Sequence, residues 1–223
     1  SMSHFSKVPL APPDAIFNLT TSYNKDTYSK KLNLGVGAYR TNEAQPYVLK
    51  VVKKTEEILL SKNENKEYLP IDGFRPFLAA ASTLVFGADS IAIEQGRVSA
   101  VQTIGGTGAV RLVAEFIKRH FPKDTTVYIP NPTWGNHKKV LSHAGVPHSD
   151  YRYYNQRNNQ MDIAGFLEDI RKAPRGSVIL LHACAHNPTG LDPTPEQWEI
   201  IKECITERDH FPFFRLCIPR FCQ

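Results

Sequence analysis

A glycine-rich turn stands where a phosphate group could bind. Gly105, Gly106, Thr107 and Gly108 join a β-branched apolar segment to an amphipathic one. Small residues let backbone N–H groups approach an anion, a helix N-terminus adds partial positive charge, and a threonine adds a hydroxyl donor. The turn lacks the lysine of a P-loop and the spacing of a dinucleotide fingerprint. We interpret it as a phosphate-binding turn or, equally, as a tight turn without a ligand.

Two further turns place an asparagine before a proline, directly after an apolar segment. They are Asn131-Pro132-Thr133-Trp134 and His186-Asn187-Pro188-Thr189-Gly190. Either Asn–Pro bond could be cis, which would aim the flanking side chains sharply. Trp134 is suited to stack on a flat heteroaromatic ring or to cap the core. Asn187 could donate to a carboxylate or phenolic oxygen, or could bond the backbone of its own turn.

Three histidines near these turns raise the question of a metal. His137, His182 and His186 lack carboxylate or cysteine partners at the spacing of a metal site, so we expect no metal. We interpret them as buried imidazoles that support a site. Gly37 follows Gly35 in a short apolar run, where it would offer a bare backbone N–H to a carboxylate or mark a bent strand.

The elements around these turns alternate between helical and extended periodicity. The apolar spacing predicts helices at 14–24, 47–60, 73–86, 109–120, 134–143, 162–172 and 195–207. It predicts strands at 98–104, 126–129, 149–154, 177–182 and from 211 onward. This alternation predicts an α/β fold with a mostly parallel sheet flanked by helices. Ligands of such sheets bind at the carboxyl ends of the strands, which is where the three turns lie.

The composition limits the classes of partner. Of the 223 residues, 41% are hydrophobic and 22% charged, which is typical of a soluble globular protein. No apolar run approaches the roughly 18 residues of a membrane helix, so we expect no membrane contact. A net charge of +5, scattered along the chain, weakly favours small anions, and no basic stripe indicates nucleic acid. Four cysteines without a CxxC pattern, and a start without a leader pattern, predict a cytoplasmic protein.

In combination, the motifs resemble those of the aspartate aminotransferases, fold-type-I enzymes that depend on pyridoxal 5′-phosphate. The resemblance rests on NLGVGAYR at 33–40, EYLPI at 67–71, GGTGA at 105–109, NPTWGNH at 131–137, LHACAHNPTG at 181–190 and DPTPEQW at 192–198. It runs from about residue 8 to residue 214. It implies amino transfer between L-aspartate and 2-oxoglutarate, giving oxaloacetate and L-glutamate, with the cofactor as electron sink.

The resemblance implies a role for each residue of the three turns. Gly105, Gly106 and Thr107 would hold the cofactor phosphate. Trp134 would stack on the pyridine ring, and Asn187 would donate to the ring oxygen and to the α-carboxylate of the substrate. Trp134 and Asn187 would thus line both the cofactor site and the substrate site.

Other positions would complete the site from outside these turns. Gly37 would contact the substrate carboxylate through its backbone. His137 and His182 would lie in the layer of residues that supports the cofactor ring. Tyr68 would reach the phosphate of the neighbouring subunit, which implies a homodimer. The resemblance also divides the chain. Residues 1–46 would form an N-terminal arm and part of a small domain, and residues 47–214 an incomplete large domain that binds the cofactor.

The resemblance stops at residue 215. There the family carries an aspartate that pairs with the protonated pyridine nitrogen, in a segment close to DSAYQGFAS. This sequence reads RLCIPRFCQ from Arg215, which puts a cation in place of an anion. One base inserted ahead of the aspartate codon would convert the family segment into these residues. We interpret 215–223 as an aberrant, frameshifted tail, and an unrelated natural tail is the alternative.

The truncation that this tail implies leaves no catalytic residue in the chain. The family's Schiff-base lysine and its substrate-selecting arginines belong to segments that this sequence does not contain, so we expect the chain alone to be inactive. Two alternatives stand beside the aminotransferase hypothesis. One is an inert truncated fragment, and the other is a phosphate-binding α/β module that never uses pyridoxal phosphate.

Overall fold

The structure, a computed structural model, describes residues 3–10, 15–33 and 39–216. Contacts within the chain divide it into two units, 1–68 and 69–223. The predicted boundary between residues 46 and 47 divides the chain at a different place, and it stays a prediction. None of the described helices is long and apolar enough to cross a membrane.

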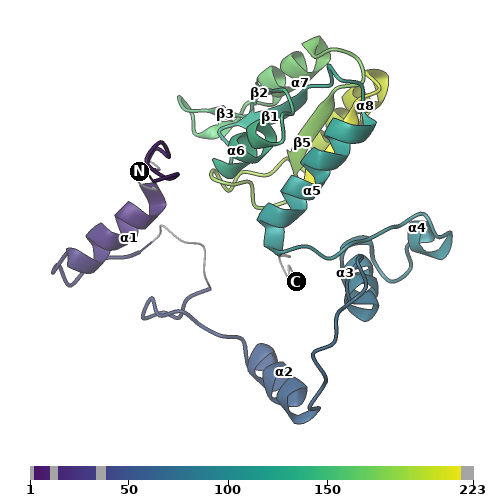
Figure 1. Cartoon of the computed structure of the whole chain (residues 1–223). Helices are drawn as coiled ribbons and strands as arrows, with labels where there is room; N and C mark the ends of the chain where they lie inside the picture. Colours follow the sequence, from purple (N-terminus) through teal and green to yellow (C-terminus); the bar gives the residue numbers. More distant parts are fainter. Residues whose placement is uncertain (1–2, 11–14, 34–38, 217–223) are drawn as a thin grey trace. The chain divides into compact units, whose positions relative to one another are not determined.

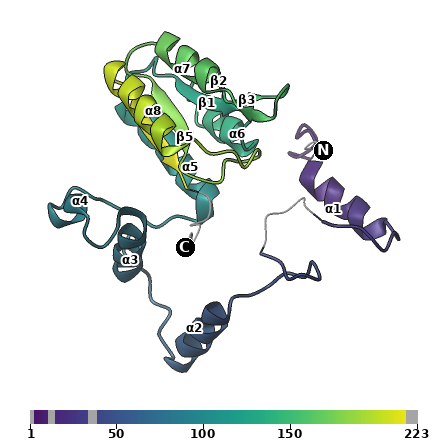
Figure 2. The same cartoon turned by 180° about the vertical axis from the view of Figure 1, so that it is seen from behind.

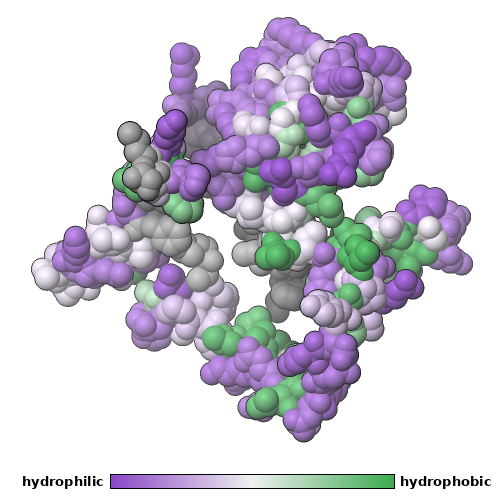
Figure 3. Space-filling model, viewed as in Figure 1, coloured by the Kyte–Doolittle hydropathy of each residue, from purple (hydrophilic) through white to green (hydrophobic). Residues whose placement is uncertain are grey.

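The first unit consists of two helices without a core of their own. These are α1 (Ala15–Lys25) and α2 (Lys50–Ser61), with one antiparallel bridge between Arg40 and Pro46 in the connection. The apolar residues of α2 lie at the surface, Leu60 being 80% exposed, and Figure 3 shows hydrophobic surface over this helix. None of the side chains described in this unit is buried.

The second unit begins with α3 (Arg75–Phe86) and the short α4 (Ile91–Glu94). The strand predicted at 98–104 is wrong, because residues 97–103 have no regular secondary structure. A strand needs a neighbour to share its ladder of hydrogen bonds, whereas the backbone N–H of Gln102 donates to Asp72 O at 2.8 Å. Val101 is 50% exposed and Ile104 95% exposed.

Four parallel strands form the central sheet, in the order β2-β1-β5-β6. They are β1 (Val127–Asn131), β2 (His148–Arg152), β5 (Val178–His182) and β6 (Phe211–Arg215). A separate antiparallel pair is formed by β3 (Tyr154–Asn155) and β4 (Gln160–Met161). The mostly parallel sheet predicted from the alternating pattern is therefore confirmed.

Helices cover both faces of this sheet (Figures 1 and 2). One face carries α5 (Gly105–His120) and α6 (Asn136–His143), and the other carries α7 (Ile163–Lys172) and α8 (Pro195–Glu207). Successive strand residues point to opposite faces. Val178 and Leu180 accordingly pack beneath α5, whereas Ile179 and Leu181 pack against α7 and α8.

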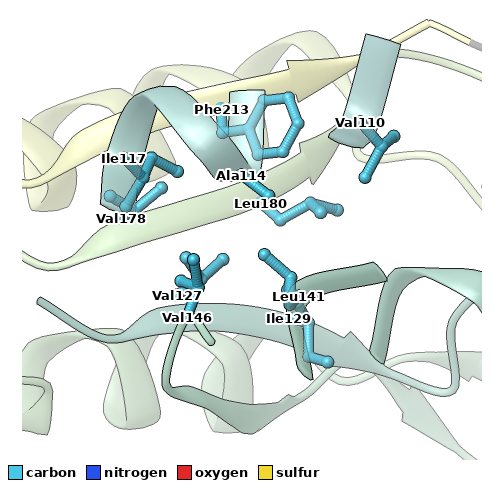
Figure 4. Close-up of a cluster of buried hydrophobic side chains, with 10 residues drawn as sticks. All are labelled: Val110, Ala114, Ile117, Val127, Ile129, Leu141, Val146, Val178, Leu180 and Phe213. Carbon is cyan, nitrogen blue, oxygen red and sulfur yellow. The ribbon is translucent and has the colours of Figure 1, made fainter. Parts of the chain in front are cut away.

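The core beneath α5 fixes the direction of that helix. Figure 4 shows Ile117 beside Val178, at the start of β5, and Val110 toward the arrowheads of the strands. The helix therefore runs opposite to the strands, and its N-terminus lies at the edge of the sheet formed by their carboxyl ends. It begins at Gly105, four residues earlier than the periodicity predicts.

Candidate functional site

Both Asn–Pro turns leave the sheet at this carboxyl edge, in a sharply bent conformation. The first follows β1 and leads into α6, and the second follows β5. The Asn131–Pro132 and Asn187–Pro188 peptide bonds are both cis, as the sequence allowed. Trp134 and Asn187 therefore project from turns that follow adjacent strands of one sheet.

A chain of hydrogen bonds joins the two turns. The backbone N–H of Asn187 donates to Nδ1 of His182 at 3.1 Å. Nε2 of the neutral His182 ring then carries the proton and donates to Oγ1 of Thr133, 3.3 Å away. The Thr133 hydroxyl in turn donates to Nδ1 of His137 at 2.8 Å. This sequence of donors leaves the ring proton of His137 on Nε2.

Burial keeps both histidines neutral. His137 is fully buried and His182 is 4% exposed. Burial, and after it the positive charge of Arg215, lowers the pKa of His137 to about 3. Burial, then the neighbouring imidazoles of His186 and His137, lowers the pKa of His182 to about 3 as well. The described residues contain no cluster of three or more His, Cys, Asp or Glu that could hold a metal ion.

Within this series of hydrogen bonds, one buried ring nitrogen has no described partner. Nε2 of His137 makes no hydrogen bond to any residue that the structure describes. The His137 ring stands edge-on to the Trp134 ring, with 5.2 Å between centroids and an interplanar angle of 88°. A buried donor without an acceptor is costly, so the region beside Trp134 is suited to a ligand or side chain with an acceptor atom.

A carboxylate shapes the turn that carries Asn187. The two carboxylate oxygens of Asp192 accept the backbone N–H groups of Ala185 and His186, each at 2.8 Å. Ala185 adopts the left-handed region at a φ of 50°, which is unfavourable for a residue with a Cβ. The His186 ring stacks on Tyr153, with 3.8 Å between centroids, and burial lowers the pKa of His186 to about 4.

The face of Trp134 is covered by a cation from β6. The Cζ atom of Arg215 lies 4.4 Å from the centroid of the Trp134 ring, well within the distance of a cation–π interaction. Arg215 is the last residue of β6 and pairs with His182 across the sheet. The sequence predicted a cation at this position but gave no reason to place it on the indole.

The glycine-rich turn forms the first turn of α5, at the same carboxyl edge. The first amides of a helix have no partner within the helix, and Gly106 and Thr107 lie at this position. Gly105 has a φ of 62°, which favours glycine. A Cβ added at Gly105 or Gly106 would meet no atom within 4 Å, so the space around the turn is open. The structure describes no contact between this turn and Trp134 or Asn187.

Two predicted site residues, Gly37 and Tyr68, belong to the first unit. Gly37 falls outside the described residues. Tyr68 ends the first unit and its side chain is fully exposed. The roles predicted for both stay predictions.

Sequence reasoning missed three residues that organise the site. Thr133 bridges two histidines, Asp192 holds the turn after β5, and the ring of Tyr153 stacks on that of His186. Asp192 offered a local signal, because it follows the turn directly and precedes a capping box at Thr194. Thr133 and Tyr153 offered none for the contacts to His182 and His186, since these partners are distant in sequence.

Taken together, the described residues fit a flat ring that carries a phosphate group. The open helix N-terminus suits the phosphate, the indole suits the ring, and the unpartnered Nε2 of His137 suits an acceptor atom. Arg215 is the one disagreement, because its guanidinium already lies on the indole.

Comparison with known proteins identifies the family of the chain. Residues 29–214 match the family model for aminotransferases of class I and II. The mitochondrial aspartate aminotransferase P2 of Lupinus angustifolius is 52% identical over 223 residues, which are all of this chain and 49% of that protein. The cytoplasmic aspartate aminotransferase of Oryza sativa subsp. japonica is 49% identical over 215 residues, 96% of this chain and 53% of that protein.

Solved structures give the same result. The cytoplasmic aspartate aminotransferase of Saccharomyces cerevisiae superposes with a TM-score of 0.89 at 40% identity, covering 96% of this chain and 52% of that one. An aromatic-amino-acid aminotransferase from Burkholderia pseudomallei, covalently bound to pyridoxal phosphate, gives 0.91 at 36% identity, covering 96% and 54%. The chain spans about half the length of the curated relatives it matches. It belongs to the class I and II aminotransferase family.

Proposed function

We propose that this chain is the cofactor-binding part of an aspartate aminotransferase, which uses pyridoxal 5′-phosphate to move an amino group between L-aspartate and 2-oxoglutarate. The observation that carries the proposal is the shared edge of the sheet, where the open N-terminus of α5, the indole of Trp134 and the turn of Asn187 all lie. The similarity to proteins named aspartate aminotransferase supports this substrate pair.

The phosphate, the flat ring and the ring oxygen of the cofactor each have a suitable group in this chain. The backbone N–H of Gly106 and the backbone N–H and hydroxyl of Thr107 would bind the phosphate, and Gly105 would provide the bend. Trp134 would stack on the ring, and the side chain of Asn187 would donate to the ring oxygen or to a substrate carboxylate. When bound, the cofactor supplies the electron sink of the reaction. The neutral His182 orients the backbone of Asn187.

The reaction also needs a lysine that attaches the cofactor. We infer that this chain alone does not turn over substrate. We infer in addition a cytoplasmic homodimer in which Tyr68 reaches the phosphate of the neighbouring subunit and Gly37 contacts the substrate carboxylate. The relatives include cytoplasmic, mitochondrial and chloroplastic forms.

Binding of pyridoxine 5′-phosphate tests the cofactor site. This alcohol cannot condense with surface lysines, so calorimetric titration reports the site alone. We expect saturable binding that inorganic phosphate competes away, and severalfold weaker binding in Thr107→Val. Thr206→Val removes an exposed hydroxyl on α8 and serves as the matched control. Tighter binding of NAD or ATP than of pyridoxine 5′-phosphate would favour the phosphate-binding module instead.

Turnover tests the second part of the proposal. The chain is mixed with pyridoxal phosphate, L-aspartate and 2-oxoglutarate, and oxaloacetate is followed beside an intact-mass measurement of the same preparation. We expect a rate equal to that of the free cofactor. A clearly faster rate would mean that a lysine within this chain is sufficient, and the inactive chain would have to be abandoned.

A further inference from the structure

The side chain at the end of β6 lies where a flat ligand would be expected. The guanidinium of Arg215 is planar and its Cζ atom is 4.4 Å from the centre of the Trp134 ring, a separation at which two flat groups stack. We propose that Arg215 occupies the face of Trp134 that a cofactor ring would use, so that this chain blocks its own stacking site. The identity of the excluded ring rests on the proposed function, whereas the blockage of the indole does not.

The backbone holds Arg215 at this position. It is aligned with His182 in the parallel register of β5 and β6, and its carbonyl accepts the N–H of Ala183 at 3.0 Å. The anchor of the side chain is therefore fixed beside the same strand end that leads to the Asn187 turn. A residue here cannot move away without breaking the end of the ladder, so only a change of side-chain rotamer would uncover the indole.

Charge reinforces the blockage. Arg215 lies close enough to His137 and His182 to contribute to their lowered pKa values, and both imidazoles are neutral. Neither of them carries a negative charge. A ring with a protonated nitrogen would bring a second cation to this place, and like charges repel strongly away from water. Rings that carry positive charge are thus excluded by electrostatics as well as by space.

The unpartnered donor of His137 points to what the place lacks. Its Nε2–H is buried without an acceptor among the described residues, and a guanidinium has donors only. A carboxylate would remove the repulsion between cations and add acceptor atoms beside this donor. The substitution Arg215→Asp is therefore expected to favour a protonated ring more than Arg215→Ala does.

Solvent access to the indole tests the blockage without any ligand. In a Trp198→Phe background, Trp134 is the single fluorophore of its kind, and acrylamide quenching measures its exposure. Arg215→Ala should raise the quenching constant about twofold. The matched control, Arg175→Ala, removes an exposed cation just before β5, at the opposite edge of the sheet, and should change nothing. Equal quenching in wild type and Arg215→Ala, with unchanged melting temperatures, would overturn the proposal.

Ligand binding then separates this proposal from the function on which it rests. Pyridoxine 5′-phosphate should bind Arg215→Ala about tenfold more tightly than wild type, and Arg215→Asp more tightly still, while inorganic phosphate binds all three equally. Equal affinity of wild type and Arg215→Ala for pyridoxine 5′-phosphate would refute the blockage and leave the cofactor site intact. Binding to none of them would refute the cofactor site, and the quenching experiment would still decide the blockage.

Discussion

One hydroxyl group holds together two segments that are about fifty residues apart in sequence. Thr133 Oγ1 lies within hydrogen-bond distance of both His137 and His182. Nδ1 of His137 and Nε2 of His182 have no other described hydrogen-bond partner. The turn of Trp134 and the turn of Asn187 therefore depend on this hydroxyl. The arrangement explains how a site at the rim of a sheet is kept in one geometry.

Thr133→Val should therefore destabilise the fold although it conserves shape. The change leaves two buried ring nitrogens without a partner, which costs about 1–3 kcal/mol. Urea unfolding at neutral pH measures the loss. Thr206→Val, which removes an exposed hydroxyl bonded to its own helix, should cost less than about 0.5 kcal/mol. If both variants cost the same, the bridge has no special role.

The two neutral histidines predict how stability depends on pH. Their pKa values are lowered to about 3 in the folded chain from about 6.5 in the unfolded chain. Between these values the unfolded chain binds more protons, so stability is complete above pH 7 and falls as the pH is lowered through this range. The loss approaches about 2 kcal/mol per histidine by pH 5.

Chemical denaturation between pH 7.5 and 5 measures this slope. His137→Gln should make the slope shallower by the contribution of one proton, whereas His143→Gln, at an exposed position on α6, should leave it unchanged. NMR titration of the imidazole protons gives an independent check. A pKa above 6 for His137 or His182 would contradict the assignment.

At the residue scale, candidate binding residues could be identified from the sequence, but the contacts between them could not. The glycines at 105 and 106, Trp134 and Asn187 stand out because their types and turns suggest binding. The cation–π contact of Arg215 with Trp134 depends on the register of β5 and β6, which no local pattern reports. The same holds for Thr133, whose partner His182 lies on another strand.

At the scale of elements, the loop between β5 and α8 shows how a turn is held in an unfavourable conformation. Asp192 accepts two successive backbone amides, and between its anchors Ala185 adopts a left-handed φ. Hydrogen bonds to a charged acceptor are stronger than neutral ones. They offset the backbone strain and direct the next residues toward the site.

Asp192→Ala should release this loop. We expect a loss of roughly 2 kcal/mol in the free energy of unfolding, together with faster hydrogen exchange at the amides of Ala185 and His186. Asp192→Asn keeps one acceptor and should show a smaller effect. Glu203→Ala removes a carboxylate from the exposed side of α8 and is the control. Unchanged exchange at both amides would show that the loop is held by other contacts.

Periodicity predicted helices and strands correctly where the segment packs on the central sheet or pairs within it. The helices at 162–172 and 195–207 differ from α7 and α8 by at most one residue. The segment at 98–104 has the pattern of a strand, yet its N–H at Gln102 bonds to Asp72 instead of to a ladder. A strand is a property of two segments, so pattern within one of them is not sufficient.

At the scale of the whole molecule, the core is distributed unevenly. Buried apolar residues begin at Leu78 and belong to the second unit, while the described part of residues 1–68 buries no side chain. Elements with few buried contacts open at little cost in free energy. Stability therefore resides in the sheet and its four helices, and the described part of the first unit should open at little cost in free energy.

Limited proteolysis should reveal this difference. Trypsin is expected to cut first within α2, after the exposed Lys50, Lys53 or Lys54, and to leave the second unit largely intact. Lys138 and Lys139 on α6 provide internal comparison sites that should be cleaved much more slowly. Mass spectrometry of a time course identifies the order. Simultaneous cleavage of α2 and α6 would contradict the uneven core.

The position of β6 has a consequence for assembly. Within the described sheet, β6 is an edge strand. It lies beside a groove of about 390 Å³ lined by apolar residues, among them Phe116, Phe211 and Phe214. Unpaired edges accept further strands, and this one ends in Arg215. A strand that pairs with β6 along its whole length would reach Arg215, whose guanidinium lies over the Trp134 ring. Addition of a strand to β6 should therefore also change the fluorescence emission of Trp134.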